Sequence, residues 1–145
     1  MEFKFIKPFG PSVLKVKIPN EIINELNNYI DQIIKDQKKK ELLNHGKKLV
    51  GDVTQEFLLE QDFAIKCGWA KFLGRCVQEW IKIDSNKQIK KFEIIDSWVV
   101  RQFKNEYNPI HYHEGHLSGV GYLKVPKFMT KNKMVKNKKI KTNGT

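Results

Sequence analysis

The hydrophobic pattern of this chain changes its period between residues 82 and 91, and this change limits the fold more than any other feature. Before it, Ile22, Leu26 and Ile30 recur at four-residue spacing, which is typical of one face of a helix. After it, residues 92–103 are rich in β-branched and aromatic side chains and predict a long strand. Helices followed by strands, without alternation between them, favour an α+β fold.

The helical part is expected to contain two helices. The first opens after Pro19, with Asn20 as its cap and three lysines, residues 38–40, at its solvent end. The second covers residues 60–82, where an apolar stripe predicts a side that faces the core: Phe63, Cys67, Ala70, Leu73, Val77 and Trp80. Short strands broken by prolines are predicted ahead of both helices, within residues 3–18.

The strand part contains three of the four histidines of the protein. Residues 105–109 are turn-forming, residues 117–125 predict a second strand, and His111, His113 and His116 lie between them. Residues i and i+2 of an extended chain point to the same side, so His111 and His113 can reach one metal ion. An isolated His-x-His pair is more often part of an ordinary surface loop. The choice between a metal site and an ordinary surface loop therefore depends on the surrounding sequence.

The surrounding run, WVVRQFKNEYNPIHYHEGHLSGVGYLKVP over residues 98–126, resembles the 2-oxoglutarate/Fe(II) oxygenases common in phage and marine bacterial genomes. These are distant relatives of the prolyl hydroxylases. The ordered set of Trp, Asn-Pro, His-x-His, Ser-Gly-Val and Tyr-Leu carries the resemblance. It implies N-terminal helices packed on an antiparallel double-stranded β-helix (a jelly roll), incomplete in this chain. It also implies a dioxygenase of the hydroxylase type that uses Fe(II) and 2-oxoglutarate, with ascorbate as an accessory reductant.

The resemblance also implies the residues of the site. It places two iron ligands at His111 and His113, although many relatives have Asp or Glu at the second position. A histidine there removes the negative ligand, and Glu114 would need a local bulge to replace it. Tyr122 and Gln102 are the residues expected to contact 2-oxoglutarate. The equal alternative for Tyr122 is a packed aromatic, and Arg101, on the opposite side of the same strand, is the alternative to Gln102 as the residue that lines the pocket. His116 is expected to be a loop residue.

Two residues of the oxygenase pattern find no counterpart after the motif. The family takes a distal histidine and an arginine that anchors 2-oxoglutarate from later strands, but no His follows His116 and no Arg follows Arg101. A jelly roll closes with about eight strands, and fewer extended segments are predicted here. The expectation is a single partial domain over residues 1–145 that lacks its C-terminal half and is weakly active or inactive alone. Completion by a second chain or by a homo-oligomer stays open.

Most of the net charge of +11 comes from the end of the chain. Eight lysines and no acidic residue lie within residues 124–145, and the rest of the chain has 19 basic and 16 acidic residues. A lysine run of this kind is typical of a solvated or flexible segment. Residues 127–145 are therefore expected to form a flexible tail, and a nucleic acid is not the expected partner.

A cupin and a non-catalytic protein are the alternatives to the oxygenase. A cupin has a Gly six residues before the first histidine and a Glu four or five residues after the second; here Asn105 and Leu117 or Ser118 occupy those places. The alternative from another class is a non-catalytic remnant or interaction protein with a basic tail. No run of eighteen apolar residues and no signal-peptide pattern is present, so a cytoplasmic protein (in the host cytoplasm if viral) without a membrane partner is expected. Cys67 and Cys76 are expected to be reduced thiols. The substrate is not encoded in any recognisable motif.

Overall fold

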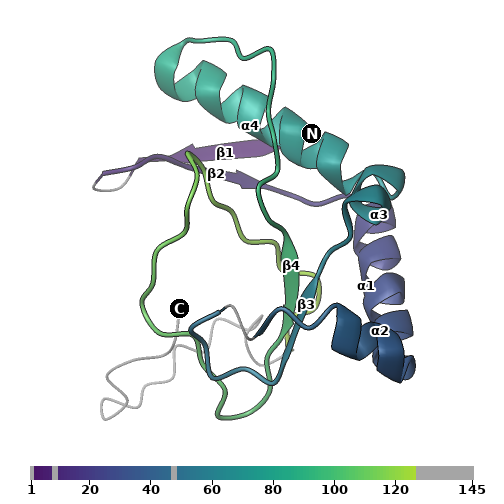
Figure 1. The fold of residues 1–145 in the computed structure, drawn as a ribbon. Coiled ribbons are helices and arrows are strands. Elements are labelled where there is room, and N and C mark those ends of the chain that lie inside the picture. The colour runs from purple at the N-terminus through teal and green to yellow at the C-terminus, as the bar shows by residue number, and fades with distance from the viewer. Residues whose placement is uncertain (1, 8–9, 47–48, 127–145) are drawn as a thin grey trace.

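A computed structural model gives the structure of residues 2–7, 10–46 and 49–126. In chain order its elements are β1 (Phe3–Ile6), β2 (Val13–Val16), α1 (Asn20–Lys35), α2 (Gln37–Leu42), β3 (Gln55–Leu58), α3 (Gln61–Lys66), α4 (Trp69–Ser85) and β4 (Trp98–Arg101) (Figure 1). The strands form two antiparallel pairs, β1 with β2 and β3 with β4. The expected α+β class is therefore confirmed.

The hairpin of β1 and β2 lies against α4 (Figure 1). The indole Nε1 of Trp80 donates to the carbonyl of Ser12 at 3.2 Å, and the Ser12 hydroxyl donates to Asp84 Oδ1 at 2.7 Å. Both contacts join residues about seventy positions apart in the sequence. They anchor the N-terminal hairpin to the longest helix.

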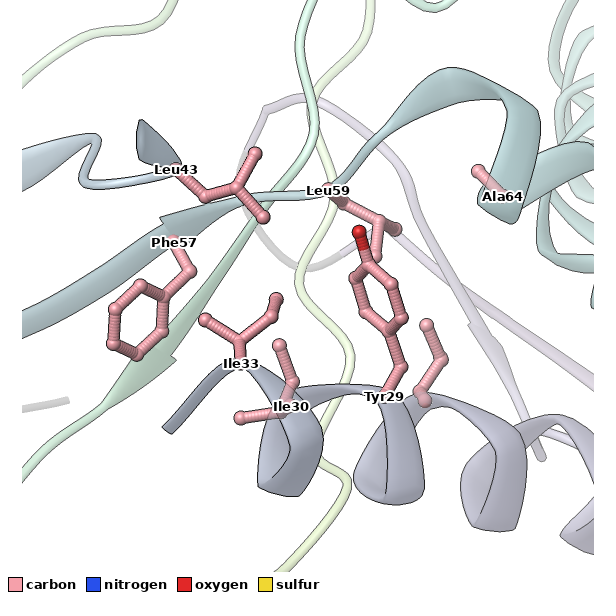
Figure 2. Packing of buried hydrophobic residues seen from close by; sticks show 8 residues of the cluster. Tyr29, Ile30, Ile33, Leu43, Phe57, Leu59 and Ala64 are labelled. Atoms are coloured by element: carbon pink, nitrogen blue, oxygen red, sulfur yellow. The ribbon is translucent and has the colours of Figure 1, made fainter. Parts of the chain in front are cut away.

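The main core lies between α1 and β3, as Figure 2 shows from close by. Side chains of α1 point toward β3 and toward the residues that flank it, because the apolar positions of α1 share one face. Ile33 is completely buried and Phe57 is 2% exposed. Tyr29 stacks on Phe63 with ring centroids 3.8 Å apart, which joins α3 to the same cluster. The long-range pair β3–β4 is thereby fixed to the helices.

The first predicted helix is present, but its ends differ from the prediction. Pro19 occupies the cap position and no side chain caps the helix, so the assignment of Asn20 as cap was wrong. The helix ends at Lys35 because Asp36 is extended, and the Asp36 carboxylate accepts the backbone N–H groups of Lys38 and Lys39. A carboxylate in this position starts a new helix, α2.

The second predicted helix is two helices. Gly68 has φ +83°, a left-handed conformation that glycine adopts without steric cost, and it separates α3 from α4. The helix α4 then runs three residues beyond the predicted end, to Ser85. Cys67 and Cys76 are free thiols, as expected for reduced cysteines.

The predicted strands after the helices are much shorter in the structure. Of residues 92–103 only Trp98–Arg101 forms a strand, and residues 117–125 form none, because neither remaining segment has a ladder partner in the described part of the chain. Within the described residues the strands make no jelly roll. The strand β3, by contrast, was not predicted. The lysine-rich tail expected at residues 127–145 lies outside the described residues. None of the helices described here is long and apolar enough to cross a membrane.

Candidate metal site

The histidine loop is held beside β3 by two backbone pairings, both of them in the segment that precedes the loop. The strand β4 pairs with β3 in a register that sets Trp98 opposite Leu58 and Arg101 opposite Gln55. After a turn, Tyr107 and Asp52 exchange backbone hydrogen bonds at 2.9 and 3.3 Å. The chain therefore pairs with residues 55–58 and then with Asp52 before it enters the loop.

The turn between these two pairings is closed by one carboxylate. Glu106 accepts the hydroxyl of Thr54 at 2.5 Å, the backbone N–H of Thr54 at 3.1 Å and the backbone N–H of Phe103 at 2.7 Å. The Thr54 hydroxyl, followed by the backbone donors, lowers the pKa of the Glu106 carboxyl. Asn105 sits in the turn with φ +71°, which asparagine tolerates better than most residues. The turn thus lies at residues 103–106, and only the first part of the predicted turn, residues 105–109, coincides with it.

The structure brings the two predicted ligands together. The Nε2 atoms of His111 and His113 are 3.0 Å apart, and the two rings meet edge to face with centroids 4.6 Å apart. The Nδ1 atom of His111 lies 2.7 Å from the carbonyl oxygen of Pro109. A carbonyl can only accept a hydrogen bond, so His111 Nδ1 donates and the Nε2 of the neutral ring keeps its lone pair. That lone pair is the one a metal ion would use.

The spacing of the two nitrogens fits one metal ion. Imidazole nitrogens bind first-row divalent metals at about 2.1 Å, so two ligands at right angles lie about 3.0 Å apart. The observed separation of the Nε2 atoms has this value. Within the described part of the chain, however, no group of three His, Cys, Asp or Glu side chains is close enough to hold an ion. The donor set that is already assembled consists of the two imidazoles.

Trp98 lies between the loop and a second histidine. Its ring centroid is 5.5 Å from that of His113 and 5.6 Å from that of His45. His45 is only 5% exposed, and its Nε2 lies 2.9 Å from Asp96 Oδ2. Trp98 is half-buried, and its ring contacts that of His113.

The buried carboxylate of Glu56 lies on the same face of the β3–β4 pair as Trp98. It is 2% exposed, and its Oε2 atom has no hydrogen-bond partner in the part of the chain that the structure describes. Burial raises the pKa of the Glu56 carboxyl, and its electrostatic interaction with the nearby His45 side chain acts in the opposite direction. No local pattern in the sequence points to Glu56, because its strand is four residues long and its partner strand lies about forty residues downstream.

The other predicted site residues are not gathered at the imidazole pair. Tyr122 is 70% exposed, and among the described contacts it makes no hydrogen bond or ring contact with either ligand histidine. The Gln102 amide donates instead to the carbonyl of Glu106 at 2.6 Å, so it braces the turn. Glu114 and His116 are exposed, as expected for loop residues. The assignments of Tyr122 and Gln102 to 2-oxoglutarate therefore stay predictions.

The pair also lies on the surface instead of in a cleft. His111 and His113 are both exposed. A surface hollow on the structure is lined by other residues, among them Glu60, Phe63 and Lys66.

Comparison with known proteins gives one match. The family model described as "Putative 2OG-Fe(II) oxygenase" matches residues 96–145, about a third of the chain, and this span contains β4 and the histidine loop. It supports the family resemblance of the motif. No curated protein and no solved structure matches the chain.

Proposed function

We propose that this chain carries the iron-binding motif of a 2-oxoglutarate- and Fe(II)-dependent dioxygenase of the hydroxylase type. The observation that supports the proposal most strongly is the 3.0 Å separation of the His111 and His113 Nε2 atoms, inside the segment that the oxygenase family model matches. Two neutral imidazoles are ligands that Fe(II) accepts in such enzymes. The described strands would then be one part of an antiparallel jelly roll in a cytoplasmic protein.

The residues of the chain have separate roles in this proposal. The Pro109 carbonyl fixes the His111 ring so that Nε2 faces His113, and Trp98 supports the His113 ring. A hydrogen bond to the second nitrogen orients a ligand histidine and raises its basicity. Tyr122 and Gln102 are the proposed contacts to 2-oxoglutarate. Bound Fe(II) with 2-oxoglutarate would supply the oxidising equivalent for hydroxylation of an unidentified substrate.

Several exposed apolar side chains around the loop agree with a larger β structure. Ile110, Tyr112, Val120 and Tyr122 are between 70% and 105% exposed, while the equivalent faces of a closed jelly roll are covered. Further strands, from whatever source, would cover them. This is the support for the jelly roll beyond the family match.

The test is release of succinate from 2-oxoglutarate by the protein, with Fe(II) and with ascorbate to keep the iron reduced. His111→Ala and His113→Ala are expected to abolish the release, because each removes one of two nitrogen ligands. His116→Ala is the matched control, since it removes an exposed histidine of the same loop, and it should retain the release. Metal binding without any succinate would favour the non-catalytic alternative. The absence of both metal binding and succinate release would contradict the proposal.

A further inference from the structure

The basic side chains of the folded part are gathered at one end of it. Seven basic and three acidic residues lie in the hairpin segment, residues 2–17, and in α4, whereas the rest of the described chain has 11 basic and 13 acidic residues. The hairpin and α4 pack on each other in the upper part of Figure 1. Charges that nearly cancel over the sequence are therefore separated in the fold.

One exposed face of α4 carries three of these basic side chains. Lys71, Arg75 and Lys82 are exposed, and the exposed Gln78 lies between the last two. Spacings of three and four residues set these four side chains on one side of the helix, and we call this row the α4 stripe. At a rise of 1.5 Å for each residue, the stripe is about 16 Å long. A linear polyanion could lie along such a row.

The cations of the α4 stripe are not used by the fold. Within residues 2–7, 10–46 and 49–126 the one ion pair joins His45 to Asp96, so the stripe cations have none. Of the two acidic residues of α4, Asp84 accepts the Ser12 hydroxyl and so points to the hairpin, and Glu79 flanks the stripe half-buried. A helix face that is only solvated usually carries charges of both signs. The row of unpaired cations therefore favours an anionic partner.

An exposed aromatic ring lies beside the α4 stripe. Phe3 is 37% exposed, and it lines one surface hollow together with Arg75, Gln78 and Glu79. Pairing of Phe3 with Val16 in the hairpin holds the ring at this place. Proteins that bind single-stranded nucleic acids combine these two elements, because cations contact the phosphates while bases stack on an aromatic ring. The hollow thus joins a stacking platform to a row of cations.

We propose that the α4 stripe and Phe3 bind a single-stranded nucleic acid, with phosphates on the three cations and a base stacked on the Phe3 ring. The near balance of charges over the sequence gave no reason to expect this partner, but their separation in the fold does. The eight lysines of residues 124–145 add attraction for the same kind of partner. An acidic protein or an anionic membrane would use the cations without the ring, so Phe3 decides between the partners. The stripe lies outside the histidine loop, and its binding is independent of the proposed function.

The experiment is fluorescence anisotropy of a labelled oligouridylate with the full chain, repeated over a range of salt concentrations. The double variant Lys71→Gln/Arg75→Gln should lower the slope of log affinity against log salt by about 1.4, because two phosphate contacts are lost. Lys38→Gln/Lys39→Gln is the matched control, since it removes the same charge from exposed positions of α2, and it should keep the wild-type slope. Phe3→Leu removes the ring and should weaken binding roughly fivefold or more at an unchanged slope.

A second ring variant separates stacking from packing of the hairpin. Phe3→Tyr keeps a ring and should bind as the wild type does, whatever Phe3→Leu does to the unfolding temperature. Equal losses of slope in the two double variants would overturn the proposal, because charge alone would then bind the oligonucleotide. Wild-type affinity in Phe3→Leu, with polyglutamate competing as well as unlabelled oligouridylate, would also overturn it and favour an acidic protein. The absence of binding by the wild type would overturn it as well.

Discussion

The packed helical core and the histidine loop are held in place by different forces. In the core, around α1 and β3, Ile33 is fully buried and Phe57 is 2% exposed. In the loop, Ile110 is 105% exposed and Tyr112 is 89% exposed. The core is stabilised by apolar burial, which contributes roughly 25 cal/mol for each Å² removed from water.

The loop depends instead on polar contacts with residues 52–54. The backbone pairing of Tyr107 with Asp52 and the hydrogen bonds of Glu106 with Thr54 are the contacts that hold it. Because the loop buries little apolar surface, substitutions in it can remove ligands without unfolding the protein. Substitutions in the core should act on stability first. Two pairs of substitutions test this difference, a third experiment tests one hydrogen bond of the core, and a fourth tests the site.

The largest contrast is expected between two isoleucines. Ile33→Ala should lower the free energy of unfolding by about 2–5 kcal/mol, because it leaves a cavity in the core. Ile110→Ala should change it by less than about 0.5 kcal/mol, as is usual for an exposed position. Urea denaturation followed by circular dichroism measures both. Equal losses in the two variants would show that the loop is packed in solution and would break the comparison.

A second contrast uses two glycines. Gly68 has φ +83°, so Gly68→Ala should destabilise the protein by roughly 1–2 kcal/mol through backbone strain alone. The added Cβ meets nothing closer than Ile22 Cδ1 at 3.9 Å, which excludes a packing clash as the cause. At Gly119 no atom lies within 4 Å of the added Cβ. Gly119→Ala is therefore expected to be neutral or slightly stabilising, and a loss as large as that of Gly68→Ala would argue against an open loop.

The smallest effect is expected from the hydroxyl of Tyr29. Burial, and then the carboxylate of Glu60 that accepts its hydrogen bond, raise the pKa of Tyr29 above its usual value. Tyr29→Phe should cost about 0.5–1.5 kcal/mol at neutral pH, the range for one hydrogen bond. A raised pKa in the folded state means that the folded protein holds this proton more tightly than the unfolded chain does. The contribution of the Tyr29 hydroxyl to the free energy of unfolding is thus fully present below about pH 10, the usual tyrosine pKa. It is lost as the pH rises above that value.

The measurement is the difference in unfolding free energy between the wild type and Tyr29→Phe at pH 8 and at pH 11. Subtraction of the two proteins removes the titration of the lysines, which both share. The difference should shrink at the higher pH. A difference that grows with pH would contradict the assigned direction of the pKa shift.

The sequence predicted the parts of this fold that have strong local signals. The four-residue spacing in α1 and the prolines around the first hairpin were sufficient to place those elements. The strand β3 could not be found in this way, because its four residues form a strand only through pairing with β4. The need for a partner strand also explains why residues 92–97 and 117–125 were wrongly predicted as strands. Their residues favour strands, but without a ladder partner in the described chain they form none.

In the candidate site, too, the sequence predicted only what has a local signal. The spacing of His111 and His113 was enough to expect two imidazoles on one side, and their Nε2 atoms do lie 3.0 Å apart. Glu56 depends on the register of β3 with β4, and His45 and Asp96 meet only because residues 45 and 96 flank the same sheet. No local pattern contains that information. Long-range pairing, more than composition, decides which polar groups surround the loop.

The central claim is that His111 and His113 together bind one divalent metal ion, and Co(II) titration tests it most directly. The visible absorption of bound Co(II) reports nitrogen ligands, and it requires no knowledge of the substrate. The account predicts one Co(II) per chain in the wild type and in His116→Ala, with the absorption lost in both His111→Ala and His113→Ala while their unfolding temperatures stay at the wild-type value. Equal Co(II) binding in the wild type and in the double variant His111→Ala/His113→Ala would contradict it.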